Sequence, residues 1–135
     1  MPAGYSGTPL YKKLGLKIDM KAISLNAPSE YASWLEGSAA VPAPAKTIGG
    51  GEDFIHMFTT SKSELEEAAK GAFNNMARDG MLWISWPKKA SKVPTEVTED
   101  VIREICLPVG LVDVKVCAVS EVWSGLKLVI RKELR

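Results

Sequence analysis

The feature that most constrains the fold is an amphipathic segment of helical length held between two short apolar runs. Residues 53–59 and 81–86 are apolar almost throughout, which is typical of strands that are covered on both faces. Between them, residues 62–78 repeat apolar side chains with the period of a helix, and Ser61 with Glu64 forms a capping box at its start. This order predicts a βαβ unit with parallel strands and a right-handed crossover.

Weaker sequence patterns extend the alternation of strands and helices toward both ends of the chain. The N-terminal segment, residues 1–19, contains one short predicted helix, and a strand is expected over residues 21–26. Residues 37–52 are rich in Ala, Pro and Gly, so we expect a connection there without a regular element. Further along, Thr98 is expected to cap a helix that ends at Pro108.

The chain closes with two predicted strands, over residues 113–122 and 126–132. Ser124–Gly125 joins them in a turn so short that the strands must be antiparallel. The whole layout predicts a single three-layer α/β domain spanning residues 1–135, with a Rossmann-like, mostly parallel sheet that ends in an antiparallel hairpin. Such a closing hairpin is similar to that of class I methyltransferases, in a trimmed form, but a shared topology does not establish a function.

Four stretches of sequence are long enough to compare with a known family. They cover residues 4–10, 86–91, 98–100 and 110–126. Together they resemble a bacterial family catalogued as domain of unknown function 3052. The resemblance implies a short cytoplasmic bacterial protein, and it transfers no catalytic residue because the family defines none.

Composition narrows the possible functions. Seventeen basic and sixteen acidic residues leave a net charge of +1, which does not favour a nucleic-acid binder. The one histidine, His56, and the two cysteines, Cys106 and Cys117, lack metal-ligand spacing, so no metal site is predicted. Without an apolar leader or a run of about 18–20 apolar residues, we expect a cytoplasmic protein with reduced thiols.

The turn after the first predicted strand bears on cofactors. A nucleotide-binding fold places glycines there so that backbone N–H groups can approach phosphate. In this chain the turn is Asn26–Glu30, which has no glycine; Pro28 removes one N–H and Glu30 adds negative charge. Standard binding of NAD or S-adenosylmethionine is therefore not expected, and no cofactor is predicted. The Gly49–Gly51 run precedes a strand instead of opening a helix, so it is interpreted as a flexible linker.

Polar side chains gather where several parallel strands should end. Ligands of open α/β sheets bind outside the carboxyl ends of the strands. Hydroxyl, amide and ammonium groups at that edge suit a small anion such as phosphate or a carboxylate. The candidate ligand-binding residues are Asn26, Thr60, Ser61, Trp86, Lys88, Lys89 and Ser91. The alternative is a solvated lysine loop, which is common on protein surfaces.

Three further residues are candidates for interaction with a partner: Tyr5, Lys115 and Trp123. Lys115 should share a strand face with Asp113 and Cys117, where it would pair with a carboxylate or extend to the edge. Trp123 either caps the core or anchors a partner. A Cys117–His56 dyad is disfavoured against a packed histidine, because His56 lies within a different strand.

These observations leave three hypotheses. The first is a non-catalytic binding or interaction module that holds a small anionic ligand or a protein partner at the carboxyl edge of the strands. The second is a methyltransferase-like enzyme with non-standard cofactor binding. The third is weak nucleic-acid binding through scattered lysines. A homodimer formed through the exposed hairpin edge stays open.

Overall fold

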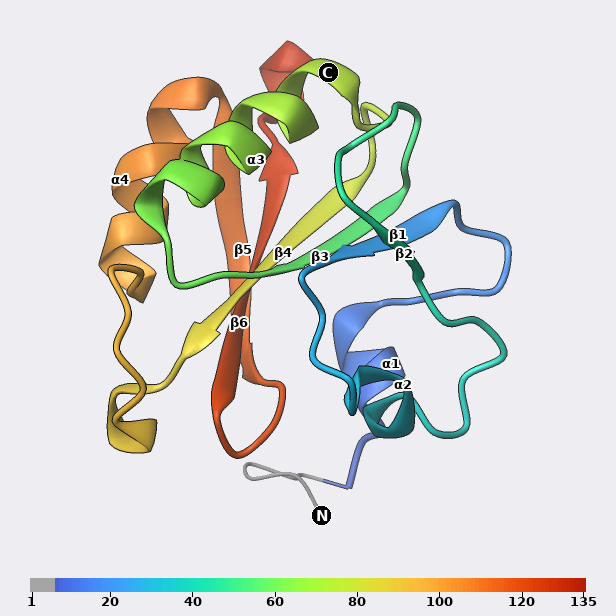
Figure 1. The fold of residues 1–135 in the computed structure, drawn as a ribbon. Helices are drawn as coiled ribbons and strands as arrows, with labels where there is room; N and C mark the ends of the chain where they lie inside the picture. Colours follow the sequence, from blue (N-terminus) through green and yellow to red (C-terminus); the bar gives the residue numbers. More distant parts are fainter. Residues whose placement is uncertain (1–6) are drawn as a thin grey trace.

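Six strands form one mixed sheet in the computed structural model, which describes residues 7–135. Their order across the sheet is β2-β1-β3-β4-β6-β5 (Figure 1). The first four are parallel, and β6 runs antiparallel to both of its neighbours. The strands are β1 (Ala22–Leu25), β2 (Ala43–Ala45), β3 (Phe54–Phe58), β4 (Met81–Pro87), β5 (Leu111–Ala118) and β6 (Trp123–Ile130).

Helices cover both faces of the sheet, which confirms the predicted three-layer α/β domain (Figure 1). On one face lie α3 (Lys62–Asn75) and α4 (Glu99–Val109), and on the other lie α1 (Leu10–Leu14) and α2 (Tyr31–Trp34). Apolar side chains fill both interfaces. Among residues 7–135, no helix is long and apolar enough to cross a membrane.

Side-chain caps begin the two long helices where the sequence predicts. Ser61 accepts the N–H of Glu64 at 3.3 Å, and Thr98 accepts the N–H of Val101 at 3.2 Å. Only half of the predicted capping box forms, because the Glu64 carboxylate accepts the Thr59 hydroxyl at 2.7 Å instead. The second helix also differs from the prediction: α4 continues through Pro108 and ends at Val109.

The closing hairpin is confirmed, but its turn is not where the sequence predicts. Ser124 and Gly125 lie inside β6, and the turn is residues 119–122. The Ser120 hydroxyl accepts the N–H groups of residues 122 and 123, which stabilises this turn. Gly125 is needed for close packing and not for the turn, because a Cβ there would lie 3.2 Å from the Trp83 ring.

The Ala/Pro/Gly-rich connection over residues 37–52 is more ordered than predicted. It contains β2, an edge strand parallel to β1, and Pro44 is tolerated there because an edge strand needs fewer ladder hydrogen bonds. The glycine run is not a free linker: the N–H groups of Gly49 and Gly50 donate to the Glu52 carboxylate at 2.8–3.0 Å. A buried carboxylate therefore organises this loop.

Candidate functional site

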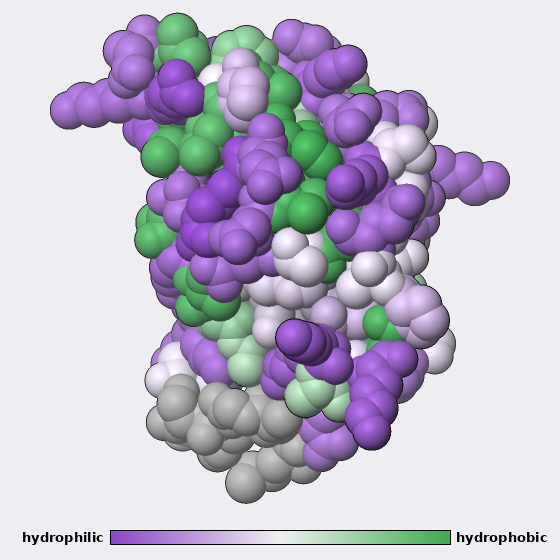
Figure 2. Space-filling model, turned by 90° about the vertical axis from the view of Figure 1, so that its left-hand side faces the viewer, coloured by the Kyte–Doolittle hydropathy of each residue, from purple (hydrophilic) through white to green (hydrophobic). Residues whose placement is uncertain are grey.

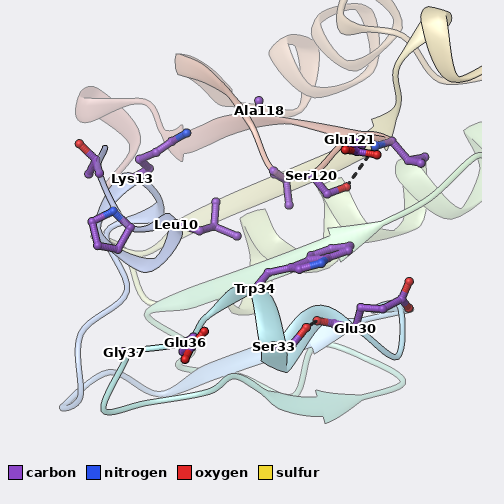
Figure 3. A pocket seen from close by; sticks show the side chains of 14 residues that line it. Leu10, Lys13, Glu30, Ser33, Trp34, Glu36, Gly37, Ala118, Ser120 and Glu121 are labelled. Atoms are coloured by element: carbon purple, nitrogen blue, oxygen red, sulfur yellow. Dashed lines mark hydrogen bonds between the residues drawn. The ribbon is translucent and has the colours of Figure 1, made fainter. Parts of the chain in front are cut away.

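A pocket of about 810 Å³ lies between α1, α2 and the 119–122 turn. Because β5 has the same direction as β4 and β1, this turn and the start of α2 both follow carboxyl ends of strands. The volume is within the range that holds small organic ligands. The side chains that give the pocket its chemistry are Lys13, Glu30, Trp34, Glu36, Ser120 and Glu121 (Figure 3).

Trp34 forms the aromatic wall of the pocket. Its indole projects across the middle of the cavity and is partly exposed (Figure 3). Beneath it, the rings of Tyr31 and Phe58 lie with centroids 6.4 Å from the indole. Tyr31 is almost fully buried, so it anchors this very short helix to the sheet and holds the indole in place.

The charges around the pocket are unequal. Glu30, Glu36 and Glu121 contribute three exposed carboxylates, whereas Lys13 contributes one ammonium group, for a net charge of 1 − 3 = −2. Glu30 and Glu121 stand on one side of the cavity, and Lys13 stands on the opposite side (Figure 3). The pocket therefore favours a cationic group, and a ligand carrying an anionic group as well would direct it toward Lys13.

A buried polar network lies beneath α2. His56 Nδ1 is 2.8 Å from the Tyr31 hydroxyl, and His56 Nε2 is 2.7 Å from the Ser85 hydroxyl. All three side chains are buried. Burial lowers the pKa of His56 to about 3 and raises the pKa of Tyr31. The imidazole is therefore neutral at physiological pH and sealed within the core, where it joins α2 to β3 and β4.

This arrangement agrees with a packed histidine, the interpretation that the sequence favours over a dyad. The hydrogen-bond partners of His56 are Tyr31 and Ser85, and Cys117 is not among them. Burial raises the pKa of the Cys117 thiol, although the nearby ammonium groups of Lys13 and Lys115 act in the opposite direction. A raised pKa is the reverse of what a reactive cysteine requires.

The predicted anion-binding residues share the carboxyl edge but do not form one pocket. Asn26, Thr60 and Lys88 each follow the end of a parallel strand, as predicted. Trp86 is buried in the core beneath α3 and α4, and the Ser91 hydroxyl donates to the Lys88 carbonyl at 2.6 Å. Of the seven candidates, Asn26 lines a smaller pocket of about 320 Å³ beside α3. Neither pocket is lined by the other six, which are Thr60, Ser61, Trp86, Lys88, Lys89 and Ser91. Anion binding at this edge stays a prediction.

The three predicted interaction residues have different surroundings. Trp123 is partly exposed and packs edge-on against Phe58, with centroids 5.2 Å apart. Lys115 is exposed and its Nζ lies 5.9 Å from the centroid of a Trp83 ring. Tyr5 lies outside the described residues.

The predicted sharing of one strand face by Lys115 and Asp113 is wrong. A β-bulge between the two residues shifts the register, so that Asp113 lies toward α4. There its carboxylate accepts a hydrogen bond from Arg103 at 3.0 Å. Lys115 consequently has no carboxylate partner on its own strand.

Sequence reasoning missed the pocket itself. The sequence indicates only that Glu30 disfavours phosphate, and it predicts no role for Trp34 or Glu121. The pocket joins three segments that are far apart in the chain, and for one of them, residues 119–122, the sequence predicts a strand. No short stretch of sequence predicts a pocket that three separate segments form together. Among residues 7–135, no group of three or more His, Cys, Asp or Glu side chains could hold a metal ion.

Comparison with known proteins places the fold but not the function. No family model matches the chain, and no curated protein matches it. Among solved structures, Aeropyrum pernix fibrillarin, in complex with natively bound S-adenosyl-L-methionine, matches with a TM-score of 0.61 at 12% identity over 89% of this chain and 73% of its own. Methanococcus jannaschii fibrillarin, a pre-rRNA processing protein, gives 0.55 at 14% identity over 91% and 69%.

A third match has the same character. An S-adenosylmethionine-dependent methyltransferase from Clostridium acetobutylicum gives a TM-score of 0.52 at 10% identity over 78% of this chain and 73% of its own. At such low identity these likenesses concern the fold alone. The chain therefore has the Rossmann-like α/β fold of the S-adenosylmethionine-dependent methyltransferases, with a six-stranded sheet that ends in an antiparallel hairpin.

Proposed function

We propose that this chain is a methyltransferase-like protein that binds S-adenosylmethionine in a non-standard position. The ligand would occupy the pocket between α1, α2 and the 119–122 turn instead of the turn after β1. The observation that carries the proposal is the composition of this pocket: an aromatic wall, Trp34, with the carboxylates of Glu30 and Glu121 on one side, and Lys13 together with Glu36 on the other. Among cationic metabolites we choose S-adenosylmethionine, because a protein of similar fold, Aeropyrum pernix fibrillarin, binds it.

The turn after β1 does not fit the standard binding mode. Asn26 adopts a left-handed conformation, with φ of 59°, and so makes the tight turn that a glycine would otherwise make. Pro28 offers no N–H, however, and Glu30 carries a negative charge where phosphate or carboxylate would lie. The helix that follows has only four residues and no side-chain cap. Its N-terminus therefore supplies little of the helix dipole that favours anions.

The chemistry of the pocket suits S-adenosylmethionine better. This ligand carries a sulfonium and an ammonium group against a single carboxylate, so its net charge is positive. A cation is stabilised beside an indole and near carboxylates, which Trp34, Glu30 and Glu121 provide. Lys13, across the cavity, suits the ligand's carboxylate. When bound, S-adenosylmethionine supplies an electrophilic methyl group, and these side chains would hold and orient the ligand that carries it.

Calorimetric titration tests the proposal. We expect wild-type protein to bind S-adenosylmethionine, and to bind S-adenosylhomocysteine at least about tenfold more weakly because that product lacks the sulfonium charge. Trp34→Ala should abolish measurable binding, and Glu121→Gln should weaken it about three- to tenfold. Glu104→Gln, which changes an exposed carboxylate on α4 away from the pocket, is the matched control and should bind normally.

Two results would overturn the proposal. One is the absence of heat at millimolar S-adenosylmethionine with protein whose circular dichroism shows a folded α/β domain. The other is binding that Trp34→Ala leaves unchanged, which would put the ligand elsewhere.

A further inference from the structure

The edge of the sheet formed by β5 presents backbone groups without a partner. Within residues 7–135, β5 is the last strand of the sheet and pairs only with β6. Two large apolar side chains on it are exposed, Val114 at 52% and Val116 at 46%. A strand edge with free N–H and C=O groups and exposed valines is a template for one more strand. The side of the molecule that carries α4 shows apolar patches broken up by hydrophilic residues (Figure 2).

A cluster of lysines lies on the opposite face of the same hairpin. Lys115 on β5 stands directly across from Lys127 on β6, and like charges in that position destabilise a sheet. The ammonium groups of Lys13, on α1, and of Lys115 both act to lower the pKa of the Cys117 thiol, so Lys13 belongs to the same group of charges. The ion pairs among residues 7–135 all involve Arg103, so none of these lysines is neutralised by a carboxylate.

The surroundings of Lys127 make this cluster more costly. Partial burial lowers the pKa of Lys127, and repulsion from Lys115 lowers it further. Both effects mean that the folded chain holds this ammonium group in an unfavourable place. A local conflict of this kind is expected where an external group of opposite charge completes the surface.

We propose that β5 is a docking edge for an extended acidic segment of a partner protein. The segment would add to the sheet as a strand beyond β5, through main-chain hydrogen bonds. Successive side chains of a strand point to opposite faces, and in β5 Lys115 faces the α1 side while Val116 faces the α4 side. The partner strand would therefore alternate acidic residues, which pair with the lysines, and apolar residues, which cover the valines.

Protection of the edge against aggregation is the competing explanation. A lysine and a bulge on an edge strand both discourage unwanted pairing, and β5 has both. This explanation accounts for Lys115 but not for Lys127, which lies on an interior strand and protects no edge. Nucleic acid is less suitable as the occupant, because the chain has a net charge of only +1 and the edge offers hydrogen-bonding groups that a peptide backbone matches.

Titration of isotope-labelled protein with blocked eight-residue peptides tests the proposal. The first probe alternates Glu and Val, the second alternates Lys and Val, and the third is an oligothymidine of eight nucleotides. We expect the Glu-Val peptide to shift the amide signals of residues 111–118 and to bind at least about tenfold more weakly when NaCl rises from about 50 to about 500 mM. The Lys-Val peptide should cause no shift.

Substitutions separate docking from edge protection. Lys127→Gln should lower the affinity for the Glu-Val peptide at least about threefold, and Lys115→Glu should abolish binding of the peptide. Lys70→Glu, at an exposed lysine on α3 that lines neither pocket, is the control and should bind like wild type. The proposal is overturned if millimolar Glu-Val peptide leaves β5 unshifted, if Lys127→Gln binds it normally, or if the oligothymidine alone binds. None of these readouts depends on the ligand of the α1–α2 pocket.

Discussion

Lowering the pH should destabilise the protein through His56 in a way that a single substitution removes. The imidazole is fully buried, and its pKa in the folded protein is about 3, against 6.5 for an exposed histidine. Between these two values the unfolded chain binds a proton at His56 that the folded chain excludes. The stabilisation is therefore complete above about pH 6.5 and is lost as the pH falls toward about 3.

The two pKa values set the size of the effect. At about pH 5, protonated histidine outweighs neutral histidine by about 30 to 1 in the unfolded chain, while the folded protein keeps the neutral form. The free energy of unfolding should then fall by about 2 kcal/mol between about pH 7.5 and about pH 5 from this one residue. Carboxylates add their own pH dependence, so the contribution of His56 must be isolated by comparison.

Urea unfolding of wild type and His56→Gln at both pH values provides that comparison. The variant cannot titrate at this position, and it should lose about 2 kcal/mol less stability than wild type over the same pH interval. At about pH 7.5 the variant itself should be less stable by about 1–3 kcal/mol, because the amide does not replace the buried ring that stacks on Phe58 with centroids 4.3 Å apart. Equal pH dependence in the two proteins would refute a buried, neutral imidazole.

Three other substitutions probe the fold. Gly110→Ala should cost at least about 2 kcal/mol in the free energy of unfolding, since φ is 122° there and a Cβ would lie 2.4 Å from the Phe73 ring; an unchanged urea midpoint would contradict this close approach. Tyr31→Phe should cost about 1–2 kcal/mol by leaving His56 Nδ1 without its partner, and chemical denaturation that matches wild type would contradict the bond. Trp83→Phe should lower the thermal midpoint, because the indole N–H that donates to the Leu14 carbonyl at 2.9 Å is lost; a midpoint equal to that of wild type would show that this bond does not hold α1.

The parts of the fold that the sequence predicts are those with strong local signals. The apolar runs over residues 53–59 and 81–86 and the capped helix between them have such signals, and the structure has β3, α3 and β4 there, although α3 ends at Asn75 and not at residue 78. The sequence does not predict the strand at Ala43–Ala45, because Ala-Pro-Ala preceded by Pro42 carries no strand signal. Pairing with β1, a tertiary interaction, decides its conformation.

The hairpin shows a second kind of error. Ser124–Gly125 has the composition of a turn, but the glycine is required for close packing against Trp83, which a local pattern cannot reveal. Because the sequence predicts the turn at Ser124–Gly125, it places Ser120 and Glu121 in a strand, whereas in the structure both line the pocket. The sequence therefore does not predict the candidate site, because the site depends on the position of the turn, and tertiary packing decides that position.

The position of a bound ligand tests the central claim most directly. A crystal structure of the protein grown with S-adenosylmethionine should show the ligand beside the Trp34 indole, its sulfonium near Glu30 or Glu121 and its carboxylate toward Lys13. Density for the ligand on the backbone of Asn26–Ser29, with the α1–α2 pocket empty, would contradict the account. It would mean that a turn without glycine can still hold the ligand in the standard way.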